Sequence, residues 1–515
     1  MLRINSLLAV CICLLVIFGS HPLLWAEEPA LPTGLEADGS SAAQEPELPS
    51  GLNDSGGSVG PKLPEGLQQE DAQGKPALPS GLESDSNGEP ALPSGLSTDS
   101  NATSESAVAG TPSNGDGGWR DQLGFPVHGF LETRFGPRLQ ADPNQSKDAT
   151  LGEARLQLET EKYWDAGTLD LKADFLLDGI TEEAEIDLRL ARFTFSPLSS
   201  VDVRAGRQVL SWGTGDLVFI NDLFPKDWVS FLSGRDVEYL KAPGDALRLG
   251  WFNDLFNLNL VYTPRFDPDR FIEGKRLSYW NAGLGRVAGE ENRIDAREPD
   301  DWFDDDEIAL RAYRNFSGYE AAVYSYFGYW KSPAGQDPVA GDYLFPKLTV
   351  YGASLQGPLG AGIANIEVGY YDSREDRSGD DPLINNSELR LLLGYEQELA
   401  TEFTGSVQYY LEQMQDYSAY EAQLPAGAKA RDKNRHLLTL RLTKLLLNQD
   451  LTLSLFTFYS PSDEDIYLRP KVSYEINDDW TVESGGNLFF GEHRHTFFGQ
   501  FEDNSNWYLS LRYSF

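Results

Sequence analysis

Cysteine is almost absent from this chain of 515 residues, and its two copies lie close together near the start. Cys11 and Cys13 fall within residues 1–26, where Arg3 is followed by a short apolar run and Ala26 precedes two glutamates. This pattern is typical of a secretory signal peptide that is removed on export. The mature chain is therefore expected to have no disulfide, no thiolate metal site and no cysteine nucleophile.

Long apolar runs are missing as well. After residue 26 the sequence has no stretch of about 18 or more apolar residues, the length that a membrane-spanning helix requires. An exported chain without such a run is either a soluble protein or a β-barrel, in which apolar and polar residues alternate along each strand.

Positive charge is scarce: 42 Lys and Arg residues stand against 80 Asp and Glu residues, for a net charge of −38. Proteins that bind nucleic acids neutralise phosphates with clustered Lys and Arg. No nucleic-acid partner is therefore expected. The densest acidic run, Glu298–Glu307, is interpreted as solvated loop surface, with divalent-cation binding as the alternative.

Signatures of catalysis and of cofactor binding are scarce too. The mature chain has four histidines, and the pair His493 and His495 lacks the neighbouring ligands that a zinc site needs. A Gly-Lys-Ser/Thr phosphate loop and a Cys-x-x-Cys-His haem attachment site are both missing. We therefore expect no resident metal, no cofactor and no enzymatic activity.

Residues 27–118 form a segment rich in Pro, Gly, Ser and acidic residues, with very few aromatic ones. Such a composition buries too little apolar surface to offset the entropy of ordering, so a disordered spacer is expected. The motif Pro-x-Leu-Pro-x-Gly-Leu occurs five times in it, at Pro29–Leu35, Pro46–Leu52, Pro61–Leu67, Pro76–Leu82 and Pro90–Leu96. The repeats are either a passive linker or a row of motifs that bind a periplasmic protein with avidity.

From residue 119 to 515 apolar residues alternate with polar ones. Within Gly167–Leu177, for example, Leu171 faces one way and Asp170 the other. About eighteen segments of roughly 9 to 12 residues have this period of two, and their length suits tilted transmembrane strands. The sequence predicts an all-β fold: a transmembrane antiparallel up-and-down β-barrel of about eighteen strands, with sixteen or twenty as alternatives.

The connections between these segments alternate in length. Short turns such as Ser317–Gly318 and Gly360–Ala361 join the strands of a pair, and loops as long as Asp267–Asp306 separate the pairs. Short periplasmic turns and long outer loops are typical of outer-membrane barrels, and an even strand number returns both ends to the periplasm. We therefore expect the outer membrane of a Gram-negative bacterium, with the spacer in the periplasm.

The closing strand has five apolar side chains on one face. They are Trp507, Leu509, Leu511, Tyr513 and Phe515. A terminal aromatic residue on such a strand resembles the C-terminal assembly signal of outer-membrane β-barrels. The resemblance implies the outer-membrane assembly machinery, outer-membrane lipid and lipopolysaccharide as partners.

The third outer loop, residues 213–245, is too apolar to lie in open water. A barrel of this size otherwise encloses an aqueous channel, so the loop is expected to fold into the lumen and to narrow or gate it. The candidates for the constriction are Arg207, Gln208, Trp212, Asp216, Asn221, Asp222, Lys226, Asp227 and Arg235.

The polar faces of the strands predict a lumen wall of mixed charge. The candidates there are Arg155, Lys172, Asp202, Arg204, Arg441 and Arg512. Opposed charges across a lumen orient dipolar or weakly charged solutes. The alternative is that they are mutually neutralising pairs that hold the wall together.

One motif in this region resembles a known family. Gly206-Arg207-Gln208, then Trp212-Gly213, Asp216 and Asn221–Pro225, is similar to a Gly-Arg-Gln…Trp-Gly…Asp…Asn-Pro pattern. That pattern belongs to poorly characterised proteobacterial outer-membrane barrels, broadly akin to alginate-export and specific-porin barrels. In this chain the Asn-Pro is spread over five residues. The alternative is structural: the two glycines bend the strand into the loop and Trp212 anchors it.

The resemblance covers mainly residues 127–515 and implies a channel or an export component. The sequence therefore predicts an outer-membrane channel that passes small solutes and is narrowed by loop 213–245. The alternative is a non-catalytic barrel in an export, lipid-transfer or electron-transfer assembly, recruited through the N-terminal repeats.

Overall fold

The computed structural model describes residues 126–424 and 429–515. The expected signal peptide, the spacer and its five repeats lie outside the described residues. The two described ranges make up nearly all of the predicted barrel region, residues 119–515.

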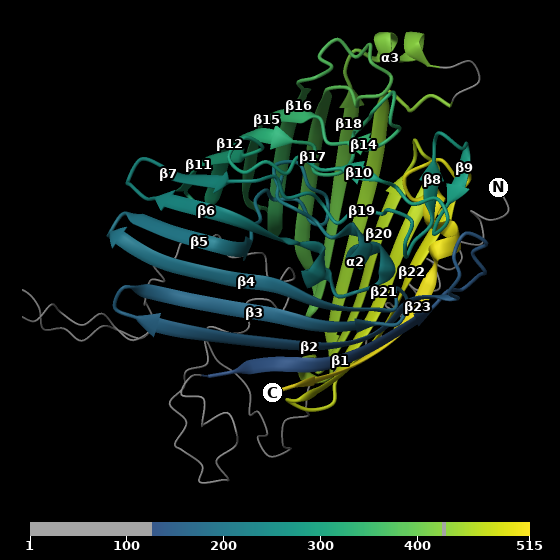
Figure 1. The fold of residues 1–515 in the computed structure, drawn as a ribbon. Helices are drawn as coiled ribbons and strands as arrows, with labels where there is room; N and C mark the ends of the chain where they lie inside the picture. The colour runs from purple at the N-terminus through teal and green to yellow at the C-terminus, as the bar shows by residue number, and fades with distance from the viewer. Residues whose placement is uncertain (1–125, 425–428) are drawn as a thin grey trace, which may run out of the picture. The chain divides into compact units, whose positions relative to one another are not determined.

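Eighteen antiparallel strands form one closed sheet (Figure 1). In chain order they are β1 (His128–Pro137), β2 (Ala149–Trp164), β3 (Gly167–Asp178), β4 (Glu183–Leu198), β5 (Val201–Val209), β6 (Pro243–Trp251), β7 (Asn257–Thr263), β11 (Glu307–Phe316), β12 (Tyr319–Tyr329), β15 (Lys347–Leu359), β16 (Gly362–Ser373), β17 (Glu388–Ala400), β18 (Phe403–Met414), β19 (Asn434–Leu446), β20 (Leu451–Ser460), β21 (Asp465–Glu475), β22 (Trp480–Gly491) and β23 (Asn506–Ser514). The sheet closes because β1 pairs with β2 on one side and with β23 on the other.

The predicted number of strands is confirmed, and each predicted segment coincides with one strand to within a few residues. The agreement follows from the period of two, which is a local property of the sequence. On β3, Leu171 is 39 % exposed and Phe175 41 %, whereas Asp174 between them is fully buried. The apolar face points outward, as in a barrel surrounded by lipid, so the fold is that of a transmembrane β-barrel.

The alternation of short turns and long loops is also confirmed. Turns such as 165–166 and 360–361 lie at one end of the barrel, and the long loops lie at the other. Four outer loops matter for the site and are numbered by their order along the chain: L1 (138–148), L3 (210–242), L4 (264–306) and L9 (492–505). The start of β1 and the C-terminus share the end with the short turns, because Phe130 pairs with Ser514.

The remaining elements are short. They are α2 (Trp228–Ser233), η3 (Val237–Leu240), α3 (Tyr417–Gln423), η4 (Leu447–Gln449), η5 (Gly499–Asn504) and the small strands β8 (Tyr279–Asn281), β9 (Arg286–Ala288), β10 (Ala296–Arg297), β13 (Gly335–Gln336) and β14 (Tyr343–Leu344). Within the two described ranges no helix is long and apolar enough to span a membrane.

The main hydrophobic core lies inside the barrel. Ile220, Phe231 and Leu240 of L3 are almost completely buried, and they belong to one cluster with Leu392 of β17 and Tyr467 of β21. L3 therefore fills part of the lumen, as the sequence predicts from its apolar composition.

Candidate functional site: the lumen occupied by L3 and L4

L3 enters the lumen directly from the end of β5. Gly213 has a φ of +85°, a conformation that favours glycine, and a Cβ there would lie 2.8 Å from the Glu367 carboxylate. Trp212 packs edge-on against Phe224, with ring centroids 4.9 Å apart, and lies 6.1 Å from Tyr324 of β12. This geometry agrees with the structural interpretation of the Trp-Gly motif.

The first lobe of L3, residues 211–224, is fixed to the wall opposite its origin. Glu367 of β16 is 1 % exposed and accepts hydrogen bonds from the backbone N and the Nδ2 of Asn221, at 2.7 and 2.9 Å. Asp216 forms an ion pair with Arg441 of β19 at 2.7 Å. Strand β19 is diametrically opposite β5, since eight of the other sixteen strands separate them on either side. The lobe thus crosses the lumen.

Asp216 is buried where the first lobe meets the far wall. Its backbone N donates a hydrogen bond to Oε1 of Gln408 on β18, at 3.2 Å. Burial raises the pKa of the Asp216 carboxyl above its ordinary value, although the Arg441 guanidinium acts in the opposite direction. The carboxyl is therefore protonated more readily than that of an exposed aspartate.

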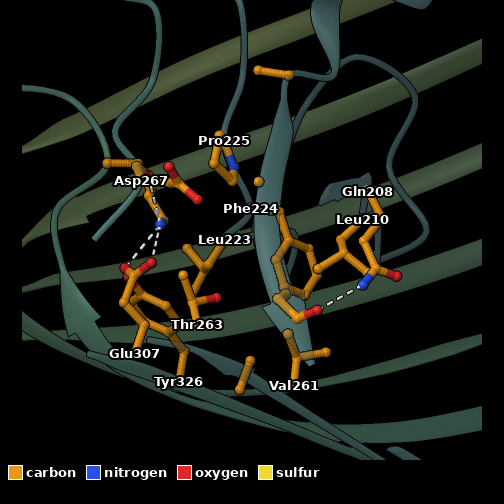
Figure 2. Close-up of a pocket in the computed structure, with 15 residues that line it drawn as sticks. Gln208, Leu210, Leu223, Phe224, Pro225, Val261, Thr263, Asp267, Glu307 and Tyr326 are labelled. Atoms are coloured by element: carbon orange, nitrogen blue, oxygen red, sulfur yellow. Dashed lines mark hydrogen bonds and ion pairs between the residues drawn. The ribbon is translucent and has the colours of Figure 1, made fainter. Parts of the chain in front are cut away.

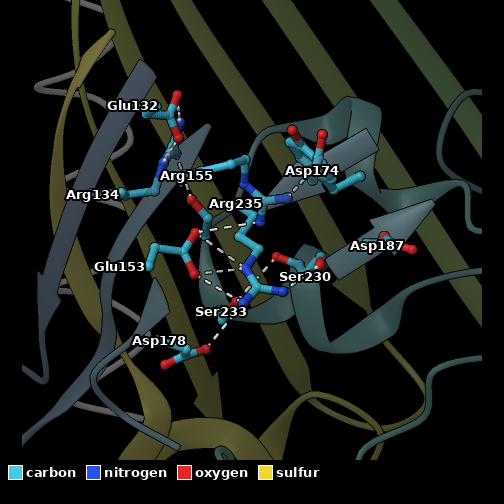
Figure 3. Close-up of polar contacts among 12 residues, drawn as sticks. Glu132, Arg134, Glu153, Arg155, Asp174, Asp178, Asp187, Ser230, Ser233 and Arg235 are labelled. Atoms are coloured by element: carbon cyan, nitrogen blue, oxygen red, sulfur yellow. Dashed lines mark hydrogen bonds and ion pairs between the residues drawn. The ribbon is translucent and has the colours of Figure 1, made fainter. Parts of the chain in front are cut away.

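The second lobe of L3, residues 226–241, packs against the wall that contains the barrel seam (Figure 3). Arg235 forms ion pairs with Glu153 of β2 at 2.9 Å and with Asp178 of β3 at 3.3 Å. Three wall side chains also donate to carbonyl oxygens of the lobe: Arg134 of β1 to Gly234 at 2.7 Å, Asn506 of β23 to Ser233 at 2.9 Å, and Tyr467 of β21 to Phe231 at 3.2 Å. Both lobes are thus attached to the barrel by buried polar contacts.

Three of the predicted constriction residues form contacts within L3. Lys226 forms an ion pair with Asp222 at 2.9 Å, and Ser211 Oγ donates to Asp222 at 2.9 Å. Asp227 caps α2 by accepting a hydrogen bond from the backbone N of Ser230, at 2.7 Å. All three are buried, so they shape L3 rather than face open solvent.

Arg207 and Gln208 lie on opposite faces of β5. Gln208 is 1 % exposed, points inward and donates to the carbonyl oxygen of Ala246 at 3.0 Å. Arg207 stands opposite Asp245 in the β5–β6 register, on the outward face, and its Nη1 lies 3.2 Å from Oδ2 of Asp245. The expectation that both line the constriction is therefore corrected for Arg207, because neighbouring strand residues point to opposite sides.

Gln208 borders a small cavity between the first lobe and the wall (Figure 2). The cavity has a volume of about 10 Å³, and its lining includes Leu210, Leu223, Phe224, Val261 and Tyr326. A space of this size holds about one water molecule. The first lobe is therefore packed closely against the wall at this point.

Most of the predicted lumen-wall residues face inward and are paired. Arg155 contacts Asp174 at 2.5 Å, Lys172 contacts Glu159 at 2.7 Å, Arg512 contacts Glu132 at 2.9 Å, and Asp202 accepts from Ser196 Oγ at 2.6 Å. Arg441 holds Asp216, and Arg204 faces Arg248 across the β5–β6 register. The pairs agree with a wall that neutralises its own charge.

The sequence did not point to L4 as part of the site. Asp269 accepts hydrogen bonds from the backbone N of Lys226 and from Nε1 of Trp228, at 2.7 and 3.0 Å. Arg270 contacts Asp187 of β4 at 2.8 Å and Asp227 at 3.3 Å. The first part of L4 therefore lies against α2, inside the mouth of the barrel.

The same segment is attached to the other side of the mouth. Arg276 donates to the carbonyl oxygen of Thr150 at 2.6 Å. Ser278 donates to Asp142 of L1 at 2.6 Å, and its backbone N donates to Asn504 of η5 in L9 at 3.0 Å. L4 thus connects L3 with L1 and L9.

A signal for this arrangement exists in the sequence. Residues 264–280 contain Phe266, Phe271, Ile272, Leu277, Tyr279 and Trp280, an apolar content similar to that of L3. The acidic run that comes after them marks the exposed half of the loop. Of that run, Asp300, Asp301 and Asp304 are exposed, whereas Glu307 is buried and paired with Lys331 at 2.6 Å.

A cavity of about 170 Å³ opens between L3, L4 and the outer ends of β3 and β4. Its charged lining comprises Asp178, Glu183, Glu185, Asp227, Glu273, Arg235, Arg270, Lys275 and Arg276. Both signs of charge meet there at the entrance to the lumen.

The comparisons with known proteins concern structures only, because no protein-family model and no curated protein matches the sequence. Pseudomonas aeruginosa OccK11 (OpdR) is 11 % identical, with 75 % of this chain and 95 % of that chain covered and a TM-score of 0.45. Acinetobacter baumannii OccAB4 is 8 % identical, with coverage of 76 % and 97 % and a TM-score of 0.48. The outer membrane channel DcaP of A. baumannii is 10 % identical, with coverage of 76 % and 97 % and a TM-score of 0.38.

Proposed function

We propose that the protein is a non-enzymatic outer-membrane channel for small solutes and that L3 sets its cross-section. The observation that carries the proposal is the attachment of the two lobes of L3 to different parts of the wall through buried charged contacts, with Asp216–Arg441 of β19 at one end and Arg235–Glu153 of β2 at the other. A barrel of this strand number encloses an aqueous channel unless a loop fills it. The Gly-Arg-Gln…Trp-Gly resemblance supports the same class of protein.

The predicted site residues divide into two roles in this proposal. Trp212, Asn221, Asp222, Lys226, Asp227 and Arg235 are buried or packed, and they position the loop. Lys172, Arg441 and Arg512 have side chains that are 25, 17 and 23 % exposed, so they remain within reach of a passing solute. The acids that pair with them limit the net field along the wall.

Removing the loop tests the channel directly. Deletion of Leu217–Leu232 is expected to raise single-channel conductance in a planar bilayer several-fold, because it takes the second half of the first lobe and most of α2 out of the lumen. The matched control is deletion of Tyr417–Gln423, which is α3 in an outer loop and has no buried residue. Absence of conductance in the parent and in the Leu217–Leu232 deletion would overturn the proposal.

A second function is proposed because of the repeats. In this second proposal, the five Pro-x-Leu-Pro-x-Gly-Leu copies recruit a periplasmic protein, and the barrel serves an export, lipid-transfer or electron-transfer assembly. The discriminating measurement is co-purification of a periplasmic protein with and without residues 27–118.

A further inference from the structure

We propose that residues 264–280 of L4 act as a brace that holds α2 of L3 in the lumen, with Asp269 and Arg270 as its positioning residues. The inference rests on the proposed channel function, since it names what keeps the constriction in place. It concerns a loop that the sequence predicts only as a long outer loop.

The brace and L3 are joined first through their backbones. The backbone N of Arg270 donates to the carbonyl oxygen of Lys226 at 2.8 Å, and the backbone N of Trp228 donates to the carbonyl oxygen of Arg270 at 3.0 Å. Asp227 and Arg270 form a parallel bridge. L4 thereby supplies a short strand-like partner to the residues that lead into α2.

The side chains of the brace then satisfy the buried donors of L3. Asp269 is 7 % exposed, and its two carboxylate oxygens accept from Lys226 N and from Trp228 Nε1. The same carboxylate accepts from Ser332 Oγ at 2.7 Å, which ties it to the loop after β12. Without Asp269 the buried backbone N of Lys226 and the partly buried indole N of Trp228 lose their acceptor, a change that costs more than the loss of an exposed hydrogen bond.

Arg270 links α2 to the barrel wall. Its Nη1 and Nη2 donate to the two carboxylate oxygens of Asp187 on β4, at 3.0 and 2.8 Å, and Nη1 also lies 3.3 Å from Asp227. Asp227 is the residue that caps α2. The planar fork of arginine suits this bidentate contact, which a lysine cannot reproduce. The start of α2 is therefore positioned relative to β4 through one L4 side chain.

The brace is fastened on both sides of the mouth, which gives it the stiffness that its role requires. One end continues from β7, and the other is held beside the seam by Arg276 and Ser278. In Figure 1 the hairpin β8–β9, where the brace ends, lies beside β22 and β23, far from β7. The segment thus spans the barrel mouth above α2.

A thiol probe in α2 reports on the brace without any transport measurement. Ser230 is fully buried, and both native cysteines lie within residues 1–26, so Ser230→Cys supplies a single thiol in the exported chain. In this background, Arg270→Ala and Asp269→Ala are compared with the parent for the rate of labelling by a membrane-impermeant maleimide. The matched control is Arg297→Gln, which breaks an exposed ion pair of the same loop, with Asp337 at 3.2 Å, away from L3.

We expect labelling to accelerate by about tenfold or more in both variants. Asp269→Ala leaves the buried backbone N of Lys226 without its acceptor, and Arg270→Ala removes the ion pair of the buried Asp227. Arg270→Lys is expected to fall between Arg270→Ala and the parent, since it keeps the charge and loses the fork. The control is expected to label at the parent rate. Heat-modifiable migration of each variant on a gel verifies that the barrel is folded.

The outcomes separate the brace from the channel. Faster labelling with raised conductance supports both proposals. Faster labelling in molecules that never conduct supports the brace and overturns the channel. Labelling at the parent rate in folded Arg270→Ala and Asp269→Ala, or equal acceleration in Arg297→Gln, overturns the brace whatever the conductance.

Discussion

Burial changes the properties of single residues in this lumen. For Asp216 it makes the contribution of the side chain to stability depend on pH. Because its pKa is raised in the folded protein, its contribution to stability is present at low pH and is lost as the pH rises through the raised value. Asp216→Asn removes this titration and leaves the other groups in place. The difference between the melting temperature of the parent and that of Asp216→Asn is therefore expected to shift in favour of the parent as the pH falls from neutral to about 4. That pH is near the ordinary pKa of aspartate.

That comparison is made on barrels in detergent at several pH values. The control is Asp202→Asn, a wall residue outside L3 that accepts from Ser196 Oγ. A constant difference between parent and Asp216→Asn at every pH would contradict the assignment.

For single residues, the sequence predicts on which face of a strand a side chain lies better than it predicts which residue that side chain contacts. The alternation places Arg155, Lys172 and Arg512 on the inward side, where the structure has them. It also implies that Arg207 and Gln208 point apart, whereas the Gly-Arg-Gln motif suggests the constriction for both. Glu367 was missed because Asn221, which it holds, is 146 residues away in the sequence, and no local pattern connects the two.

Among the elements, the closing strand behaves as its apolar face predicts. Trp507, Leu509 and Leu511 are 42, 58 and 41 % exposed on the outward face, and the backbone of Phe515 bonds to Gly129 at both N and O. A role of Phe515 in assembly stays a prediction. A charged residue on the lipid face near the membrane interface destabilises a barrel by only about 0–1 kcal/mol. A large assembly defect of a charged variant would therefore not be explained by lost contact with lipid.

Phe515→Lys is accordingly expected to reduce the amount of heat-modifiable barrel in outer membranes several-fold, through loss of a recognition signal. Molecules that do insert are expected to keep the parent's reversal potential in a salt gradient. Ser514→Lys, one position earlier on the inward face, is the control and should assemble normally. Normal assembly of Phe515→Lys would contradict the prediction that Phe515 is part of the assembly signal.

For L3 the sequence predicts that the loop lies inside the barrel, but for neither L3 nor L4 does it predict which part of the wall the loop contacts. The apolar content of L3 was sufficient to place it inside the barrel. The first part of L4 has a similar apolar content, but the acidic run after it favours a solvated surface loop. Which wall each loop meets depends on packing among distant strands, and the sequence of either loop does not contain that information.

For the whole molecule, the strand number and the loop asymmetry were predictable because both rest on local periodicity. The barrel closes with β1 and β23, and neither includes a residue before His128. Removing residues 27–118 is therefore expected to leave insertion and heat-modifiability unchanged. If the repeats recruit a partner, the same deletion abolishes co-purification of a periplasmic protein. Unchanged co-purification would leave the repeats as a linker.

The contacts of L3 with the seam make the placement of the loop and the closure of the barrel depend on each other. Arg134 on β1 and Asn506 on β23 donate to the carbonyl oxygens of Gly234 and Ser233 at the end of α2. β1 and β23 are the first and the last strand of the closed sheet along the chain. Both bonds exist only when L3 lies in the lumen and these two strands are paired, so a chain with a misplaced L3 lacks two contacts beside the ladder that closes the barrel.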